Sequence, residues 1–161
     1  MAAVFLIAGV NQSVAQHSLM QLSVRFPGNE VDGMLMIKDL DSAFRYIVMA
    51  KTGLKIADVT ITKRSFNYSY RYLLPDLDKR KIKQLLAGPF YLFGYPESDT
   101  PRKKRKVKVK SKSGEKIVFV YDDGKLQKKR GFGLFNARVR VFYRKEEIVI
   151  KQFPVGMRIW R

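Results

Sequence analysis

The chain contains 161 residues, 46% of them hydrophobic and 12% aromatic, which is enough to bury the core of one ordinary domain. Its 32 lysine and arginine residues against 14 acidic residues give a formal net charge of +18, which predicts a polyanionic partner, with RNA or DNA ahead of an acidic membrane surface. Because cysteine is absent, the sequence excludes disulfides, zinc fingers and thiol nucleophiles, and we expect neither a metal site nor a cofactor.

The positive charge is concentrated in the second half of the chain. Residues 1–74 carry 8 basic and 5 acidic residues (+3), which leaves 24 basic and 9 acidic residues (+15) for residues 75–161. We therefore expect the polyanion-binding face in the second half. No apolar segment approaches the roughly 20 residues of a membrane span, so we expect no membrane partner and a cytoplasmic protein, bacterial or phage-encoded.

The first forty residues predict strands. The apolar run 3–10 is typical of a buried central strand. Apolar residues alternate with polar ones over 20–26, the chain breaks at 27–33, and a second apolar run covers 34–40. This pattern predicts a strand, loop, strand unit.

The next segment predicts a helix over residues 42–52. Asp41 or Ser42 can cap its first turn, the apolar residues that follow fall on one helical face, and Gly53 is a natural end.

Residues 54–74 are predicted to be extended. Phe66, Tyr68, Tyr70 and Tyr72 stand at every second position, so they share one face of a strand. Such a stripe either packs into the core, which we favour, or stacks on nucleic-acid bases.

A second helix is predicted after Pro75, ending at Gly88, with a basic outer face that includes Lys79, Arg80 and Lys83. Residues 94–101 then form a polar break bounded by proline, which we interpret as a possible hinge within a single domain covering 1–161.

Beyond the hinge the pattern is that of β-hairpins. Strands are predicted at 105–110, 115–121, 136–144 and 147–153, with turns at 111–114, 122–125 and 144–147. With two helices among the strands, the predicted fold class is α+β, a β-rich, ferredoxin-like sandwich whose C-terminal half is rich in hairpins.

The basic strand is the main candidate for phosphate binding. Val107 and Val109 alternate with lysines, so a strand here would bury the valines and project a row of cations about 6 to 7 Å apart. The alternative is an edge strand whose lysines only deter aggregation. Residues 101–107 resemble a nuclear-import signal, but we do not expect that role because the valine alternation continues directly from them. The cations of this segment are Arg102, Lys103, Lys104, Arg105, Lys106, Lys108 and Lys110.

Two further segments are candidates for chemistry. Lys128, Lys129 and Arg130 precede a glycine-flanked Phe132, a loop-like sequence that could approach phosphates and stack on a base. His17 is the only histidine, and therefore the default group for proton transfer near neutral pH.

The segment 111–135 resembles the C-terminal part of the CRISPR repeat-processing endoribonucleases of the RAMP superfamily, type I-F branch. The resemblance rests on the turn with Ser111, Ser113 and Gly114, on the apolar strand 117–121, and on the aromatic, Gly, Leu sequence at 132–134. It also includes the strand that ends in Phe26 and Pro27.

This resemblance implies a RAMP-type sandwich and metal-independent cleavage of a hairpin RNA to a cyclic phosphate, with the product retained in a surveillance complex. His17 would transfer the proton, Ser111 would orient the 2′-hydroxyl, Ser113 would help to bind RNA, and Phe132 would stand where the family carries tyrosine. The alternative is a non-enzymatic structural or interaction protein of a virion or ribonucleoprotein, including a phage-encoded mimic or inhibitor.

Overall fold

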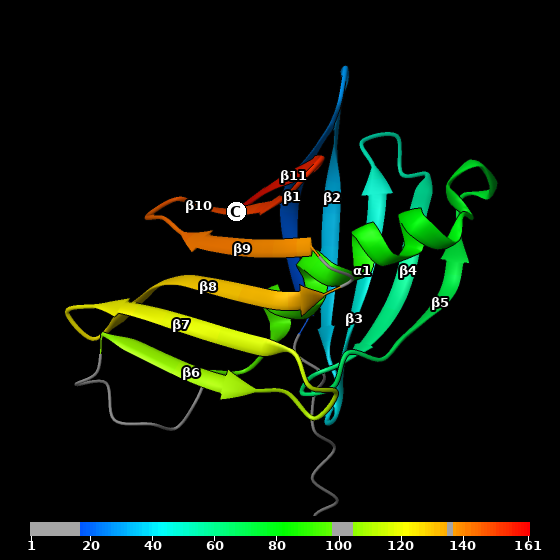
Figure 1. The fold of residues 1–161 in the computed structure, drawn as a ribbon. Helices are drawn as coiled ribbons and strands as arrows, with labels where there is room; N and C mark the ends of the chain where they lie inside the picture. Colours follow the sequence, from blue (N-terminus) through cyan, green and yellow to red (C-terminus); the bar gives the residue numbers. More distant parts are fainter. Residues whose placement is uncertain (1–16, 98–104, 135–136) are drawn as a thin grey trace, which may run out of the picture.

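In the part of the chain that the structure describes, one antiparallel sheet of eleven strands surrounds a single α-helix (Figure 1). The computed structural model describes residues 17–97, 105–134 and 137–161, with backbone only for residues 17, 132–134 and 137. The spatial order of the strands is β5-β4-β3-β2-β1-β11-β10-β9-β8-β7-β6. The strands are β1 (His17–Phe26), β2 (Asn29–Asp39), β3 (Ala43–Ala50), β4 (Lys55–Thr62), β5 (Tyr68–Leu73), β6 (Lys106–Lys110), β7 (Lys116–Asp122), β8 (Lys125–Leu134), β9 (Ala137–Tyr143), β10 (Glu147–Gln152) and β11 (Val155–Trp160).

The predicted α+β, ferredoxin-like sandwich with two helices is therefore wrong. The described residues contain a short 3-10 helix, η1 (Pro75–Leu77), and one α-helix, α1 (Arg80–Gly94). The protein is mostly β, and its layers are a single sheet and one helix. In the described part of the chain, no helix combines the length and the apolar character needed to cross a bilayer.

The predicted helix over 42–52 is strand β3. It lies between β2 and β4 in antiparallel pairing, with Tyr46 and Val48 buried on the side of α1. The same apolar residues fit a helical face and a strand, and pairing with two neighbouring strands decides for the strand. Gly53, at a φ of 84°, ends no helix; it turns the chain from β3 to β4.

The second predicted helix is confirmed, with shifted ends. It begins at Arg80 rather than near Pro75, and it continues past Gly88 and Pro89 to Gly94. A Cβ at Gly88 would lie 2.8 Å from the Gln152 side chain, so this glycine allows the helix to approach the sheet closely.

The predicted hairpins are largely confirmed. Residues 20–26 lie in β1 and residues 34–39 in β2, joined by a tighter turn than expected. The four predicted C-terminal strands are present. The prediction missed β8, whose glycines we interpreted as a loop, and β11. Register shifts interrupt β8 on both sides, which hides its alternation in the sequence. The strand predicted at 3–10 lies outside the described residues, as do residues 98–101 of the hinge predicted at 94–101.

The inner face of the sheet packs on α1. In Figure 1 the strands β2 to β5 run upright whereas β6 to β9 run across, and α1 lies between these two halves. Tyr46 stacks on Phe90 of α1 with ring centres 4.7 Å apart, and its hydroxyl donates a hydrogen bond to the Phe90 carbonyl at 3.0 Å. Of the predicted aromatic stripe, Phe66, Tyr68 and Tyr70 pack against the core, as favoured. Tyr72 does not, because it is 38% exposed.

Close approach of β2 to β3 makes Gly33 sensitive to substitution. A Cβ at Gly33 would lie 2.1 Å from the Met49 carbonyl oxygen, so two backbones would have to separate. We expect Gly33→Ala to lower the free energy of unfolding by at least about 2 kcal/mol in urea titrations. Gly156→Ala is the matched control, because a Cβ there would lie 4.0 Å from its nearest heavy atom. This variant should raise or lower the free energy of unfolding by no more than about 1 kcal/mol. Equal losses in both variants would contradict this account.

Candidate functional site

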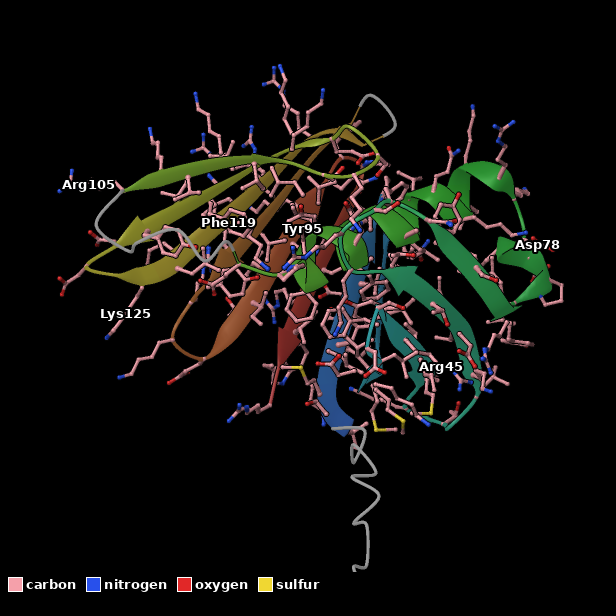
Figure 2. All side chains as sticks on the ribbon, turned by 90° about the horizontal axis from the view of Figure 1, so that it is seen from below. Arg45, Asp78, Tyr95, Arg105, Phe119 and Lys125 are labelled. Atoms are coloured by element: carbon pink, nitrogen blue, oxygen red, sulfur yellow. The ribbon has the colours of Figure 1, made fainter. Side chains whose placement is uncertain are left out.

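The outer face of β6 to β10 carries a dense group of cations, which we call the basic face. Val107, Ile117 and Val141 are buried on the inner side of these strands, and the side chains between them point outward. Figure 2 shows nitrogen-tipped side chains standing away from these strands, with Phe119 and Tyr95 on the opposite, inner side. The basic face consists of Lys106, Lys108, Lys110, Lys116, Lys128, Arg130, Arg138, Arg140 and Lys151.

The strand register places several of these cations directly opposite one another. Lys110 of β6 faces Lys116 of β7. Arg130 of β8 faces Arg140 of β9, which in turn faces Lys151 of β10. Neighbouring strands are only about 4.8 Å apart, and like charges directly opposite on one face destabilise a sheet. Bound anions would relieve this repulsion.

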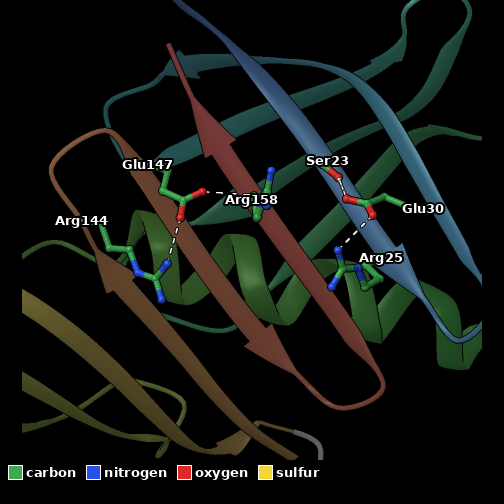
Figure 3. Close-up of polar contacts among 6 residues, drawn as sticks. All are labelled: Ser23, Arg25, Glu30, Arg144, Glu147 and Arg158. Carbon is green, nitrogen blue, oxygen red and sulfur yellow. Dashed lines mark hydrogen bonds and ion pairs between the residues drawn. The ribbon is translucent and has the colours of Figure 1, made fainter.

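Two acidic residues of the neighbouring strands pair with cations that do not belong to the basic face. Glu147 contacts Arg144 at 2.9 Å and Arg158 at 3.7 Å, and Glu30 contacts Arg25 at 3.0 Å (Figure 3). Within residues 17–97, 105–134 and 137–161, no ion pair neutralises any of the nine cations of the basic face.

An aromatic ring lies among the cations. The Lys128 ammonium is 4.3 Å and the Lys151 ammonium 5.7 Å from the centre of the Phe142 ring. Partial burial lowers the pKa of Lys128, and the charges of Arg130, Arg140 and Lys151 lower it further. A phosphate bound here would stabilise the charged form of this lysine.

Arg130 also has an unused hydrogen-bond donor. Its buried Nε has no partner in the described structure. Arg130, Arg138 and Arg140 together line a small cleft of about 90 Å³. An anion reaching this cleft could accept a hydrogen bond from a guanidinium group.

Ser111 and Ser113 are both engaged in the β6–β7 turn. Each hydroxyl donates to the same Glu115 oxygen, at 2.6 Å for Ser113, and the Glu115 amide donates to Ser111 at 3.1 Å. Partial burial raises the pKa of Glu115, but the two serine hydrogen bonds outweigh it and hold this pKa below its usual value. Ser113 also accepts a hydrogen bond at 2.6 Å from the Phe66 amide, so the cluster fastens the turn to the β4–β5 connection.

For several other predicted site residues, the structure gives the backbone alone or no position. His17 begins β1 opposite Lys38, and Phe132 lies in β8 opposite Lys116; their side chains are outside the described structure. Arg102, Lys103 and Lys104 are also outside it. Arg105 is exposed immediately before β6 (Figure 2).

The predicted helix cations are separated from the basic face. Lys79 and Arg80 are exposed at the start of α1, and Lys83 forms an ion pair with Asp78. Figure 2 shows Asp78 at the opposite end of the molecule from Arg105. The structure therefore does not unite this helix and the basic strand in one surface.

Lys129 points inward and is not part of the basic face. It is only 4% exposed, and its ammonium donates to the carbonyls of Phe93 at 2.9 Å and Tyr95 at 2.7 Å. Burial lowers its pKa to about 8, and the charge of Glu97 opposes this shift. Lys129 thus satisfies carbonyl groups at the end of α1, and we omit it from the candidate interface.

Our sequence reasoning missed four members of the basic face. They are Lys116, Arg138, Arg140 and Lys151. The signal was available, because Arg138 and Arg140 alternate with buried Val139 and Val141 in the same way as the lysines of β6. What the sequence did not show is that β9 lies beside β8, close enough for these rows to merge.

No protein-family model matches this chain, and no curated protein matches it either.

The lowered pKa of Lys129 predicts a pH-dependent stability. Because the folded pKa of about 8 lies below the ordinary value of 10.5, the unfolded chain binds more protons between these values, and stability should rise with pH there. Lys129→Met should abolish this contribution. In urea titrations, the stability of the wild type relative to the variant should increase by about 2 kcal/mol between about pH 7.5 and about pH 9.5. A constant difference across this range would show that Lys129 has an ordinary pKa.

Proposed function

We propose that this protein binds RNA through the basic face. The observation that carries the proposal is the row of facing cations Arg130, Arg140 and Lys151, which no acidic side chain of the described structure neutralises. A folded protein that maintains such repulsion gains stability when a polyanion binds to it. The same binding releases the counterions condensed on the nucleic acid.

The dimensions of the basic face suit a phosphate backbone. Outward lysines along β6 are about 6 to 7 Å apart, and cations across the strands are about 4.8 Å apart. Charges at these two spacings can follow a backbone along the strands or across them. Binding led by phosphates in this way is expected to depend little on base sequence.

Phe142 favours RNA with accessible bases over a duplex. Its half-buried ring is surrounded by Lys128 and Lys151 on an open sheet surface. Bases of single-stranded segments stack on aromatic side chains in such a setting. A hairpin RNA, in which a loop presents unpaired bases, therefore fits the face, and other subunits of a ribonucleoprotein would be further partners. We expect the protein to bind RNA in the cytoplasm of a bacterium, whether it is encoded by the bacterium or by a phage.

The salt dependence of RNA binding tests the proposal. The affinity for a fluorescent hairpin RNA should fall steeply as the salt concentration rises. The double variant Arg130→Gln, Arg140→Gln should reduce the slope of log K against log salt by about 1.4, because each of two lost phosphate contacts on single strands contributes about 0.7. Fluorescence anisotropy at several salt concentrations measures both quantities.

A matched double variant controls for net charge. Lys51→Gln combined with Lys55→Gln removes the same charge at the β3–β4 connection, where these lysines pair with Asp32 and Asp58. This control should leave the slope nearly unchanged. Equal effects of the two double variants, or binding that is insensitive to salt, would contradict the proposal. Preferential binding to vesicles rich in anionic lipid would instead assign the basic face to a membrane surface.

The cleavage implied by the resemblance to repeat-processing endoribonucleases stays a prediction. If the resemblance holds, the protein should cleave a cognate hairpin RNA in the presence of EDTA. The variant His17→Ala should lose this cleavage but still bind the RNA. Gel analysis of the products tests this. If the wild type binds RNA but leaves it intact, the non-enzymatic alternative, a structural or interaction protein of a ribonucleoprotein or virion, is favoured.

A further inference from the structure

A cavity of about 310 Å³ lies on the inner side of the sheet, whereas the cations of the basic face lie on its outer side. It is lined by residues of β1 to β5 and β11, by η1 and by the middle of α1. Leu22, Val24 and Val59 line it from the sheet, and Leu86 and Phe90 line it from α1. Protein interiors pack densely and leave few voids larger than a water molecule, so a space of this size requires an explanation.

The lining of the cavity is almost entirely apolar. The Tyr70 hydroxyl, which could have been an exception, donates a hydrogen bond at 2.7 Å to the Lys83 carbonyl and is thereby satisfied. Asp76 is the one charged residue among those that line the cavity in the described structure. An apolar cavity holds water poorly because water finds no partners there, whereas an apolar ligand gains by leaving solvent.

Two residues of the cavity lining reach the solvent. Asp76 is exposed, and Val31, which also lines the cavity, is 42% exposed although it is apolar. A ligand would therefore enter with its apolar part toward Leu22 and Phe90 and leave its polar head near the Asp76 carboxylate. A carboxylate head would be repelled there, whereas an alcohol or an amine could form a hydrogen bond with Asp76.

We propose that this cavity binds a single aliphatic chain of about ten carbons whose head group is uncharged or cationic, since each methylene occupies about the 30 Å³ that a water molecule takes in the liquid. The ligand class is a medium-chain alcohol or amine, free or as part of a larger amphiphile. The proposal does not depend on RNA binding, because none of the cavity residues belongs to the basic face.

A homologous series of alkanols tests the length of the site. Affinity, measured by displacement of Nile red or by isothermal titration calorimetry, should rise about fourfold per added methylene. It should stop rising near ten carbons, where the cavity is full. Decylamine should bind more tightly than decanoate, because only the latter is repelled by Asp76.

Two variants test the location of the site. Ala57 is 2% exposed and lines the cavity, so Ala57→Leu should fill it and abolish decanol binding. Asp76→Lys changes an exposed residue outside the core and should reverse the preference between decylamine and decanoate. It keeps the proposal testable if Ala57→Leu does not fold.

The variants of the basic face provide the cross-control. Arg130→Gln with Arg140→Gln should retain decanol binding, and Ala57→Leu should retain RNA binding, so failure of either function is distinguishable from failure of the other. The proposal is overturned if no alkanol binds, if affinity rises with chain length without a limit, or if both cavity variants bind as the wild type does. Alkanol binding that competes with self-association in sedimentation experiments would instead assign the cavity to a second copy of the chain.

Discussion

The structure depends on the burial of one continuous sheet face against a single helix. Eleven strands at about 4.8 Å spacing would span roughly 50 Å if the sheet were flat, whereas the 15 residues of α1 are only about 22 Å long. The sheet must therefore curl around α1 to bury its apolar side. Tyr46, stacked on Phe90, and Lys129, bonded to the carbonyls of Phe93 and Tyr95, hold the two halves of the sheet to this one helix.

This constraint produces both candidate binding regions. On the inner side, residues 86–92 of α1 are buried, while a cavity of about 310 Å³ remains between Leu86 and Phe90 of this helix and the strands β1 to β4. On the outer side, the described structure places no second layer over β6 to β10, so their outward side chains meet solvent. Seven of the nine cations of the basic face are exposed and keep their hydration, which a covering layer would remove.

The comparison of sequence and structure separates two kinds of error. Period-two alternation predicted β6, β7 and β9 correctly, because each of these strands buries alternate residues. β10 was also predicted correctly, although it buries the adjacent residues Val149 and Ile150. The same reasoning failed for β3, where apolar residues satisfy both a helical and an extended pattern, and for β8, where register shifts disturb the alternation. In both strands the neighbours decide the conformation, and neighbours are not visible in a local pattern.

The sequence by itself determined the strong positive charge of the second half, the alternation of lysine and valine in β6, and the amphipathic character of α1, because these are local properties of the chain. Only the tertiary structure decided which cations share a surface. It joined Lys110 with Lys116, and Arg130 with Arg140 and Lys151, and it turned Lys129 inward. It also placed Ser111 and Ser113 where their hydroxyls donate hydrogen bonds to Glu115, and it left an apolar cavity beside Ala57. These outcomes follow from strand register and sheet curvature, which arise from pairing between residues far apart in the chain.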